Sequence, residues 1–255
     1  MDLGLAGRGV LVTGASGGIG AATATALAAE GARVAVHCFR NRERAEELAA
    51  RIGGHVVQGD LRRPEEAASV VSEAVAALGS VDVCVANSGG WDEDDVPVWE
   101  MSLDRFHRVV EDNLTAPFLT CREYLRHVKD TGVGSIVLVS SVSATFGEAG
   151  NADYAAAKAG VAYGFARTLK NEIVRIAPEG RVNVVAPGWT LTGGATPETA
   201  VVERATATRP LKRLATPEDV AAAVVWLASP VVSGMCSGEI VHVAGGMEGR
   251  LVQGA

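Results

Sequence analysis

The chain has 255 residues, of which 48% are hydrophobic and 21% are charged, so it can bury a full hydrophobic core. This composition excludes an intrinsically disordered or fibrous protein. The formal net charge is −7, and an acidic chain lacks the surplus of cations that binding to a nucleic-acid backbone requires. We therefore expect no nucleic-acid partner.

The sequence has no feature of a membrane, disulfide-bonded or metal-binding protein. Its longest apolar run, 220–228, is far shorter than the ~20 residues that span a bilayer, and its start does not resemble a secretion signal. The 4 cysteines form no CxxC pair, and the 5 histidines lack the spacing of metal ligands. We expect a soluble, cytoplasmic protein with no membrane partner and no metal.

Taken in chain order, apolar segments of strand length alternate with Ala-rich segments of helical periodicity. The predicted strands are 9–12, 33–38, 55–58, 81–86, 135–140, 181–186 and 239–243. The predicted helices are 19–30, 42–52, 64–78, 103–128, 153–176 and 217–228. Because most strands are apolar on both faces, this order predicts an α/β fold with a mostly parallel sheet and helices on both faces.

A glycine-rich turn follows the first predicted strand and leads into the first predicted helix. Its sequence is Thr13-Gly14-Ala15-Ser16-Gly17-Gly18-Ile19-Gly20. Glycines allow a tight turn and close backbone approach, and the helix N-terminus presents free N–H groups to a pyrophosphate. In this context, between a strand and a helix, the turn predicts a dinucleotide-binding site.

The glycine-rich turn has the spacing TGxxxGxG, and six further motifs lie later in the chain. They are Asp60-Leu61, Ala86-Asn87-Ser88-Gly89, Asn113, Ser141, Tyr154-Ala-Ala-Ala-Lys158 and Pro187-Gly188 with Thr192. Together they resemble the short-chain dehydrogenase/reductase family, and within it most closely the 3-oxoacyl-carrier-protein reductases and related ketoreductases. The resemblance implies a single doubly wound Rossmann domain over 1–255 with a seven-stranded parallel sheet.

Tyr154 and Lys158 are four residues apart in a predicted helix, so their side chains share one face. A nearby cation favours the phenolate, which predicts a Tyr154 pKa lowered from ~10 toward neutrality and a hydroxyl that can act as acid or base. The resemblance implies that Tyr154 donates the proton and that Ser141 hydrogen-bonds the substrate carbonyl. It also implies that Asn113 holds a relay water that reaches Lys158.

The resemblance implies a cofactor site along the carboxyl edge of the sheet, with Asp60 at the adenine amino group. Its residues are Gly14, Ser16, Gly17, Gly18, Ile19, Gly20, Phe39, Arg40, Asn41, Asp60, Leu61, Asn87, Ser88, Gly89, Tyr154, Lys158, Pro187, Gly188, Thr190 and Thr192. After the second strand Arg40 precedes the first acid, Glu43, which favours NADP(H) over NAD(H). The alternative is that Arg40 is an ordinary surface charge.

The substrate pocket is expected on loops around the nicotinamide, and its apolar residues favour an apolar or aromatic ketone. The expected lining residues are Trp91, Ser143, Phe146, Trp189 and Leu191. Segment 188–216 has no predicted element and is expected to be a substrate lid, with Gly193-Gly194 as a hinge. The acidic run 92–95 is interpreted as a solvated surface that would repel an acidic carrier protein, which leaves free and carrier-bound ketones as equal alternatives.

The predicted function is the NADPH-dependent reduction of a ketone to a secondary alcohol. The first alternative, an NAD-dependent secondary alcohol dehydrogenase, is disfavoured by Cys38 and Arg40. The second, a non-catalytic dinucleotide-binding regulatory or scaffold protein, is disfavoured because all four catalytic positions are filled. The resemblance also implies a homotetramer or homodimer that assembles through 103–128 and 153–176.

Overall fold

The computed structural model describes residues 1–92, 94–192, 198–207 and 209–247. One seven-stranded sheet has the order β3-β2-β1-β4-β5-β6-β7, and every neighbouring pair is parallel. The strands are β1 (Gly9–Val12), β2 (Arg33–Cys38), β3 (His55–Gln58), β4 (Val83–Ala86), β5 (Ser135–Val139), β6 (Arg181–Pro187) and β7 (Ile240–Val243). The predicted fold class is confirmed, and the strand order reverses between β1 and β4, where open α/β sheets bind ligands.

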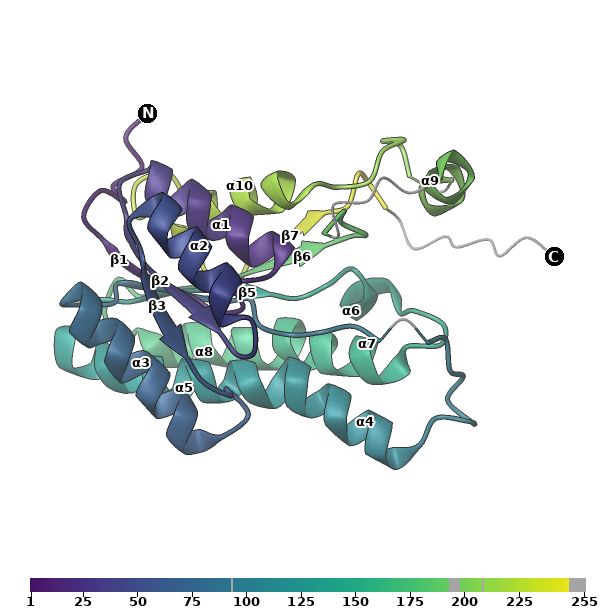
Figure 1. Cartoon of the computed structure of the whole chain (residues 1–255), viewed down its shortest axis with the longest axis horizontal. Coiled ribbons are helices and arrows are strands. Elements are labelled where there is room, and N and C mark those ends of the chain that lie inside the picture. Colours follow the sequence, from purple (N-terminus) through teal and green to yellow (C-terminus); the bar gives the residue numbers. More distant parts are fainter. Residues whose placement is uncertain (93, 193–197, 208, 248–255) are drawn as a thin grey trace.

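Helices cover both faces of the sheet (Figure 1). On one face lie α1 (Gly18–Ala29), α2 (Arg42–Ile52) and α10 (Pro217–Ala228). On the other lie α3 (Pro64–Leu78), α5 (Ala116–Thr131) and α8 (Ala166–Ile173). The start of α10 follows the sequence prediction, because Pro217 occupies its first turn and Thr216 forms a capping box with Asp219.

Each face of the sheet has its own hydrophobic core. Leu11 and Leu138 pack with α3, α5 and α8, whereas Val12 and Val139 pack with α1, α2 and α10. Consecutive strand residues point to opposite faces, so a strand buried on both faces must be apolar throughout. This requirement explains why the strands are readable as continuous apolar runs.

The two longest predicted helices contain π-helical turns that the sequence did not predict. The first consists of α4 (Leu103–Val110), η1 (Glu111–Thr115) and α5. The second consists of α7 (Ala152–Ala159), η2 (Gly160–Phe165) and α8. A π-helical turn holds an extra residue and changes which side chains share a face, and such turns often occur at functional sites.

Two short helices were also missed. These are α6 (Ser143–Phe146) and α9 (Thr199–Thr206), and α9 lies inside the segment expected to have no element. Such short helices contain too few turns for an apolar period to be recognised. The expected hinge Gly193-Gly194 lies outside the described residues. Within the described part of the chain, no helix is long and apolar enough to cross a membrane.

Candidate active site

The glycine-rich turn occupies the carboxyl end of β1. Gly14 has a φ of +63°, which favours glycine, and a Cβ on Gly20 would collide with the Gly14 carbonyl oxygen. Helix α1 has no side-chain cap at Gly17 and no acid in its first turn, so its first N–H groups are open to an anion. The turn therefore fits the pyrophosphate of a dinucleotide.

The buried His37 side chain on β2 is hydrogen-bonded to the glycine-rich turn. Its Nδ1 accepts a hydrogen bond from the Gly14 backbone N–H at 3.0 Å, so Nε2 carries the proton and donates to the Gly59 carbonyl oxygen, also at 3.0 Å. Burial lowers the pKa of His37 to about 4, which keeps the ring neutral. No spacing in the sequence indicates this role, because its partners follow β1 and β3.

The loop after β4 is fixed to the same turn. The Thr13 hydroxyl oxygen accepts hydrogen bonds from the backbone N–H groups of Asn87 and Ser88 at 3.0 and 2.9 Å. Asn87 Nδ2 in turn donates to the Thr13 carbonyl oxygen at 2.9 Å. The Ser88 hydroxyl is buried and has no partner among the described residues. A buried hydroxyl without a partner fits a ligand that offers hydroxyl groups, such as a ribose.

Two arginines flank Phe39 at the end of β2. The guanidinium carbons of Arg40 and Arg62 lie 4.9 and 5.2 Å from the centre of the Phe39 ring. Arg62 also donates from Nε and Nη2 to the two Asp60 carboxylate oxygens, each at 2.8 Å, and this pairing lowers the pKa of Asp60. Asp60 thus binds Arg62 in this structure, and Arg62 is a site residue that sequence reasoning missed.

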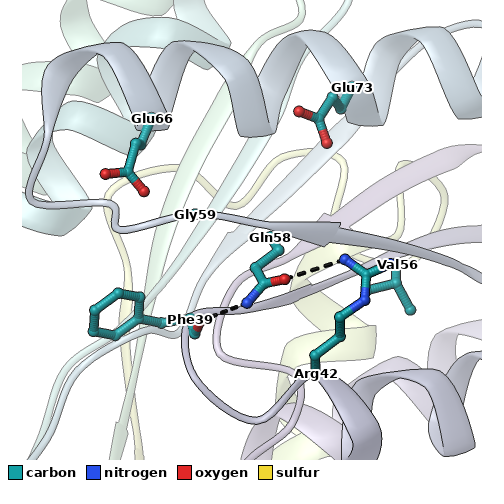
Figure 2. A pocket seen from close by; sticks show the side chains of 7 residues that line it. All are labelled: Phe39, Arg42, Val56, Gln58, Gly59, Glu66 and Glu73. Atoms are coloured by element: carbon teal, nitrogen blue, oxygen red, sulfur yellow. Dashed lines mark hydrogen bonds between the residues drawn. The ribbon is translucent and has the colours of Figure 1, made fainter.

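A pocket borders this end of the sheet, between α2, α3 and the edge strand β3 (Figure 2). It is lined by Phe39, Arg42, Val56, Gln58, Gly59, Glu66 and Glu73. Arg42 donates to Gln58 Oε1 at 3.1 Å and to Glu46 at 2.7 Å. The pocket contains none of the four expected catalytic residues, so it neighbours the expected adenosine end of the site and not the reaction centre.

The four expected catalytic residues lie on three different elements that meet beside Gly89. Asn113 belongs to η1, Ser141 follows β5, and Tyr154 and Lys158 belong to α7. Lys158 Nζ lies 5.6 Å from the centre of the Tyr154 ring and donates to the Val139 carbonyl oxygen at 3.0 Å. A Cβ on Gly89 would lie 2.6 Å from Asn113 Oδ1 and 3.1 Å from Lys158 Nζ. The two polar groups therefore approach the same point.

Hydrogen bonds fix the orientation of Asn113 and Ser141. Asn113 Nδ2 donates to the carbonyl oxygens of Gly90 and Val109 at 2.8 and 3.0 Å, and the Gly90 N–H donates to its Oδ1 at 3.2 Å. Ser141 Oγ accepts from the Ser143 hydroxyl at 2.9 Å. The structure therefore holds both side chains in defined positions beside Tyr154 and Lys158.

The predicted lowering of the Tyr154 pKa is wrong for this structure. Burial raises the pKa of Tyr154 to about 12, although its hydrogen bond with Ser141 acts in the opposite direction. Burial also lowers the pKa of Lys158 to about 8. Loss of hydration therefore dominates both groups. Tyr154 is protonated at neutral pH, which is the state that a proton donor requires.

The expected substrate-lining residues surround the same edge of the sheet. Ser143 and Phe146 are on α6, and the segment after β6 carries Trp189 and Leu191. That segment is held by hydrogen bonds from the Leu191 N–H to the Ala215 carbonyl oxygen and from the Ala215 N–H to the Trp189 carbonyl oxygen, at 2.9 and 3.2 Å. Trp91 follows β4 and is half exposed.

The expected cofactor residue Thr192 lies against the first turn of α1. A Cβ on Gly18 would come within 2.9 Å of Thr192 Cβ, so the absence of a side chain at Gly18 allows this close approach. The segment after β6 therefore contacts the glycine-rich turn directly.

Within the acidic run, Asp94 and Asp95 are exposed, as the sequence interpretation expects, Asp92 is partly exposed, and Glu93 lies outside the described residues. Arg105 donates from Nη1 to the Asp94 carbonyl oxygen and from Nε to Asp153 Oδ2, each at 2.9 Å. Asp92 pairs with Arg108. Asp153 is fully buried, and its Oδ1 accepts from the Tyr154 backbone N–H at 2.8 Å. Arg105 thus connects the acidic run to the helix that carries Tyr154.

The doubly wound sheet, the open glycine turn and the Asn-Ser-Tyr-Lys cluster define a dinucleotide-dependent oxidoreductase. A family model described as Enoyl-(Acyl carrier protein) reductase matches residues 14–248. The chain belongs to the short-chain dehydrogenase/reductase family, and its relatives include 3-oxoacyl-acyl-carrier-protein reductases and an acetoacetyl-CoA reductase. Membership implies a nicotinamide dinucleotide cofactor and dehydrogenase or ketoreductase chemistry.

Three similar proteins illustrate the match. The chain is 39% identical over 244 residues to cis-4-hydroxycyclohexanecarboxylate dehydrogenase of Sinomonas cyclohexanicum, covering 94% of this chain and 96% of that protein. It is 36% identical over 249 residues to 3-oxoacyl-acyl-carrier-protein reductase of Vibrio cholerae, covering 95% and 98%. A crystal structure of a dehydrogenase/reductase from Sinorhizobium meliloti 1021 matches with a TM-score of 0.86 at 32% identity, covering 96% of both chains.

Proposed function

We propose that the protein reduces a ketone to a secondary alcohol with NADPH, with Tyr154 as the proton donor. The observation that carries this proposal is the cluster of Asn113, Ser141, Tyr154 and Lys158 next to the loop after β4, which is hydrogen-bonded to the glycine-rich turn. The nicotinamide of the bound cofactor supplies the hydride. The hydroxyl groups of Ser141 and Tyr154 polarise the carbonyl oxygen, and Tyr154 transfers its proton to that oxygen. Buried Lys158 favours the tyrosinate that remains.

The preference for NADP(H) rests on the charge at the end of β2. Arg42 is engaged by Glu46, whereas Arg40 has no ion pair with any carboxylate in the described ranges. Arg40 stacks on Phe39, which leaves its guanidinium available to a ribose 2′-phosphate. We expect Arg40→Ala to weaken NADPH binding about tenfold or more and NADH binding little. Fluorescence titration with both cofactors tests this preference, and an equal loss for both would refute it.

The substrate class is a free ketone. One similar protein is named for a cyclic hydroxy acid and another for a 3-oxoacyl group on a carrier protein. Arg105 and Arg108 anchor the acidic run beside Trp91, and the exposed carboxylates there would repel an acidic carrier. We propose that the described part of 188–216, which includes α9, serves as the lid over this substrate; residues 193–197 and 208 lie outside the described structure.

Assembly into a homodimer or homotetramer through the two long helices is part of the proposal. Apolar side chains are exposed on this surface, including Leu103 at 65%, Phe118 at 43% and Phe106 at 38%. A second copy of the chain would cover them. Sedimentation analysis measures the oligomeric state directly, and a monomer would contradict this part of the proposal.

The central test replaces Tyr154 with Phe, which removes only the hydroxyl group. Loss of NADPH absorbance with a ketone panel that includes 4-oxocyclohexanecarboxylate should show turnover by the unmodified protein and none by Tyr154→Phe. NADPH binding should be nearly unchanged in the variant. The matched control is Tyr163→Phe, whose hydroxyl contacts Thr145, and this variant should keep turning over the ketone. A Tyr154→Phe protein with near-normal rates would refute the proposed mechanism.

A further inference from the structure

One buried arginine, Arg209, has no hydrogen-bond or ion-pair partner among the described residues. Among the described residues, three arginines are buried, namely Arg105, Arg181 and Arg209, with exposures of 9%, 6% and 7%. Arg105 pairs with Asp153, and Arg181 donates to Ser233 and to carbonyl oxygens at the end of α10. The Arg209 side chain makes no hydrogen bond or ion pair with the described residues. A buried cation without compensation is costly, so its retention calls for an anionic ligand.

Arg209 lies over the carboxyl ends of β6 and β7. A Cβ on Gly188 would lie 3.7 Å from Arg209 Nη1 and 3.1 Å from Ala244 Cβ. Strands β6 and β7 pair in register, and the Gly188 N–H continues this ladder by donating to Val243. Alternate residues of a strand face the same side of the sheet, so Gly188 faces the same side as Val184. Val184 packs in the core that contains α5 and α8. Arg209 is therefore on the side of the sheet that carries the α7–α8 segment.

A row of contacts connects Arg209 with Ser141. His242 precedes Ala244 by two residues on β7, and its Nε2 lies 2.9 Å from the Thr145 hydroxyl on α6. Its ring lies 6.0 Å from the Phe146 ring. Helix α6 begins at Ser143, whose hydroxyl donates to Ser141. These contacts place Arg209 and Ser141 on the same side of the sheet, with α6 between them.

We propose that Arg209 binds a carboxylate of the substrate, so that the substrate is an oxo acid whose carboxylate is separate from the reacting carbonyl. This inference rests on the proposed ketone reduction and specifies its substrate class. The guanidinium group matches a carboxylate through paired hydrogen bonds. Burial lowers the pKa of Arg209, as expected for a cation without an opposite charge nearby.

The neighbouring cations favour a singly charged carboxylate over a doubly charged phosphate. Lys212 Nζ is occupied by the carbonyl oxygens of Thr206 and Ala207 at 3.0 and 2.9 Å. Arg213 pairs with Asp219. Arg209 is thus the one cation of the described 209–213 segment that remains available, and a single guanidinium balances a single negative charge.

Paired substrates test this proposal without any variant. We expect the unmodified protein to reduce 4-oxocyclohexanecarboxylate with a kcat/KM about 10- to 100-fold above that for its uncharged methyl ester, the range expected for a charge-assisted contact. Arg209→Met should remove this preference by lowering kcat/KM for the acid while leaving kcat/KM for the ester unchanged. The control Arg51→Met, at an exposed position on α2, should retain it. Equal rates for acid and ester in the unmodified protein would overturn the proposal.

A binding measurement separates this inference from the proposed reaction. Calorimetric titration of cyclohexanecarboxylate into the NADPH-loaded protein requires no turnover, and we expect binding that Arg209→Met abolishes and Arg209→Lys partly retains. If the unmodified protein binds the carboxylate but turns over no ketone, the proposed ketone reduction is refuted and the carboxylate site at Arg209 is supported. Absent binding, or equal binding by unmodified protein and a folded Arg209→Met, would refute the site. Thermal unfolding verifies folding, and Arg209→Lys replaces Arg209→Met if the latter does not fold.

Discussion

The Arg105–Asp153 ion pair offers a stringent test of how the proposed site is held in place. Asp153 is fully buried, and the Arg105 side chain is 10% exposed. Arg105→Met would leave the Asp153 carboxylate without its cation in a dry environment. Removal of one partner from a buried pair costs about 3 to 5 kcal/mol. For a chain of this size we therefore expect a fall in Tm of about 10 °C.

A double-mutant cycle measures how much of this loss comes from the stranded charge. Asp153→Asn removes the charge but keeps an oxygen that can accept from the Tyr154 N–H. The double variant Arg105→Met with Asp153→Asn should therefore recover about 2 kcal/mol of the loss seen in Arg105→Met alone. Urea unfolding of the four proteins gives the coupling energy. Strictly additive effects, or an Arg105→Met loss below about 1 kcal/mol, would refute this reasoning.

Two further predictions follow from buried titratable groups. Burial lowers the pKa of Lys158 from 10.5 to about 8, so the unfolded chain binds the Lys158 proton more tightly than the folded chain does, and the charged side chain destabilises the fold at neutral pH. Lys158→Met should therefore raise the unfolding free energy by about 1 to 3 kcal/mol while abolishing turnover. A variant that is less stable in thermal melts would contradict this prediction. Burial lowers the pKa of His37 from 6.5 to about 4, so stability that is present above pH 6.5 should decline by up to about 3 kcal/mol as the pH falls through 4. His37→Gln should flatten this pH dependence in urea titrations, the exposed control His55→Gln should not, and an unchanged slope in His37→Gln would exclude the assignment.

The sheet could be predicted from the sequence because its strands are buried on both faces. The bounds 33–38 and 55–58 agree with β2 and β3. Helix starts were equally clear where Pro64 and Pro217 fix the first turn. The π-helical turns were not predictable, because a π-helical turn differs from an α-helix in its hydrogen-bond pattern, which the composition of residues 111–115 and 160–165 does not specify.

The site was predicted as a set of residues, but its electrostatics were not. Arg105 and Asp153 are 48 residues apart and meet only in the folded chain. The Tyr154 pKa depends on the depth of burial, which spacing along a helix does not report. His37 and Arg62 were missed for the same reason, since their roles come from contacts with Gly14 and Asp60 and not from a motif.

The contact between Gly18 and Thr192 packs the first turn of α1 directly against the segment after β6. Any side chain added at Gly18 would push against Thr192. A larger residue at this position would therefore alter the first turn of α1 and the segment after β6 together.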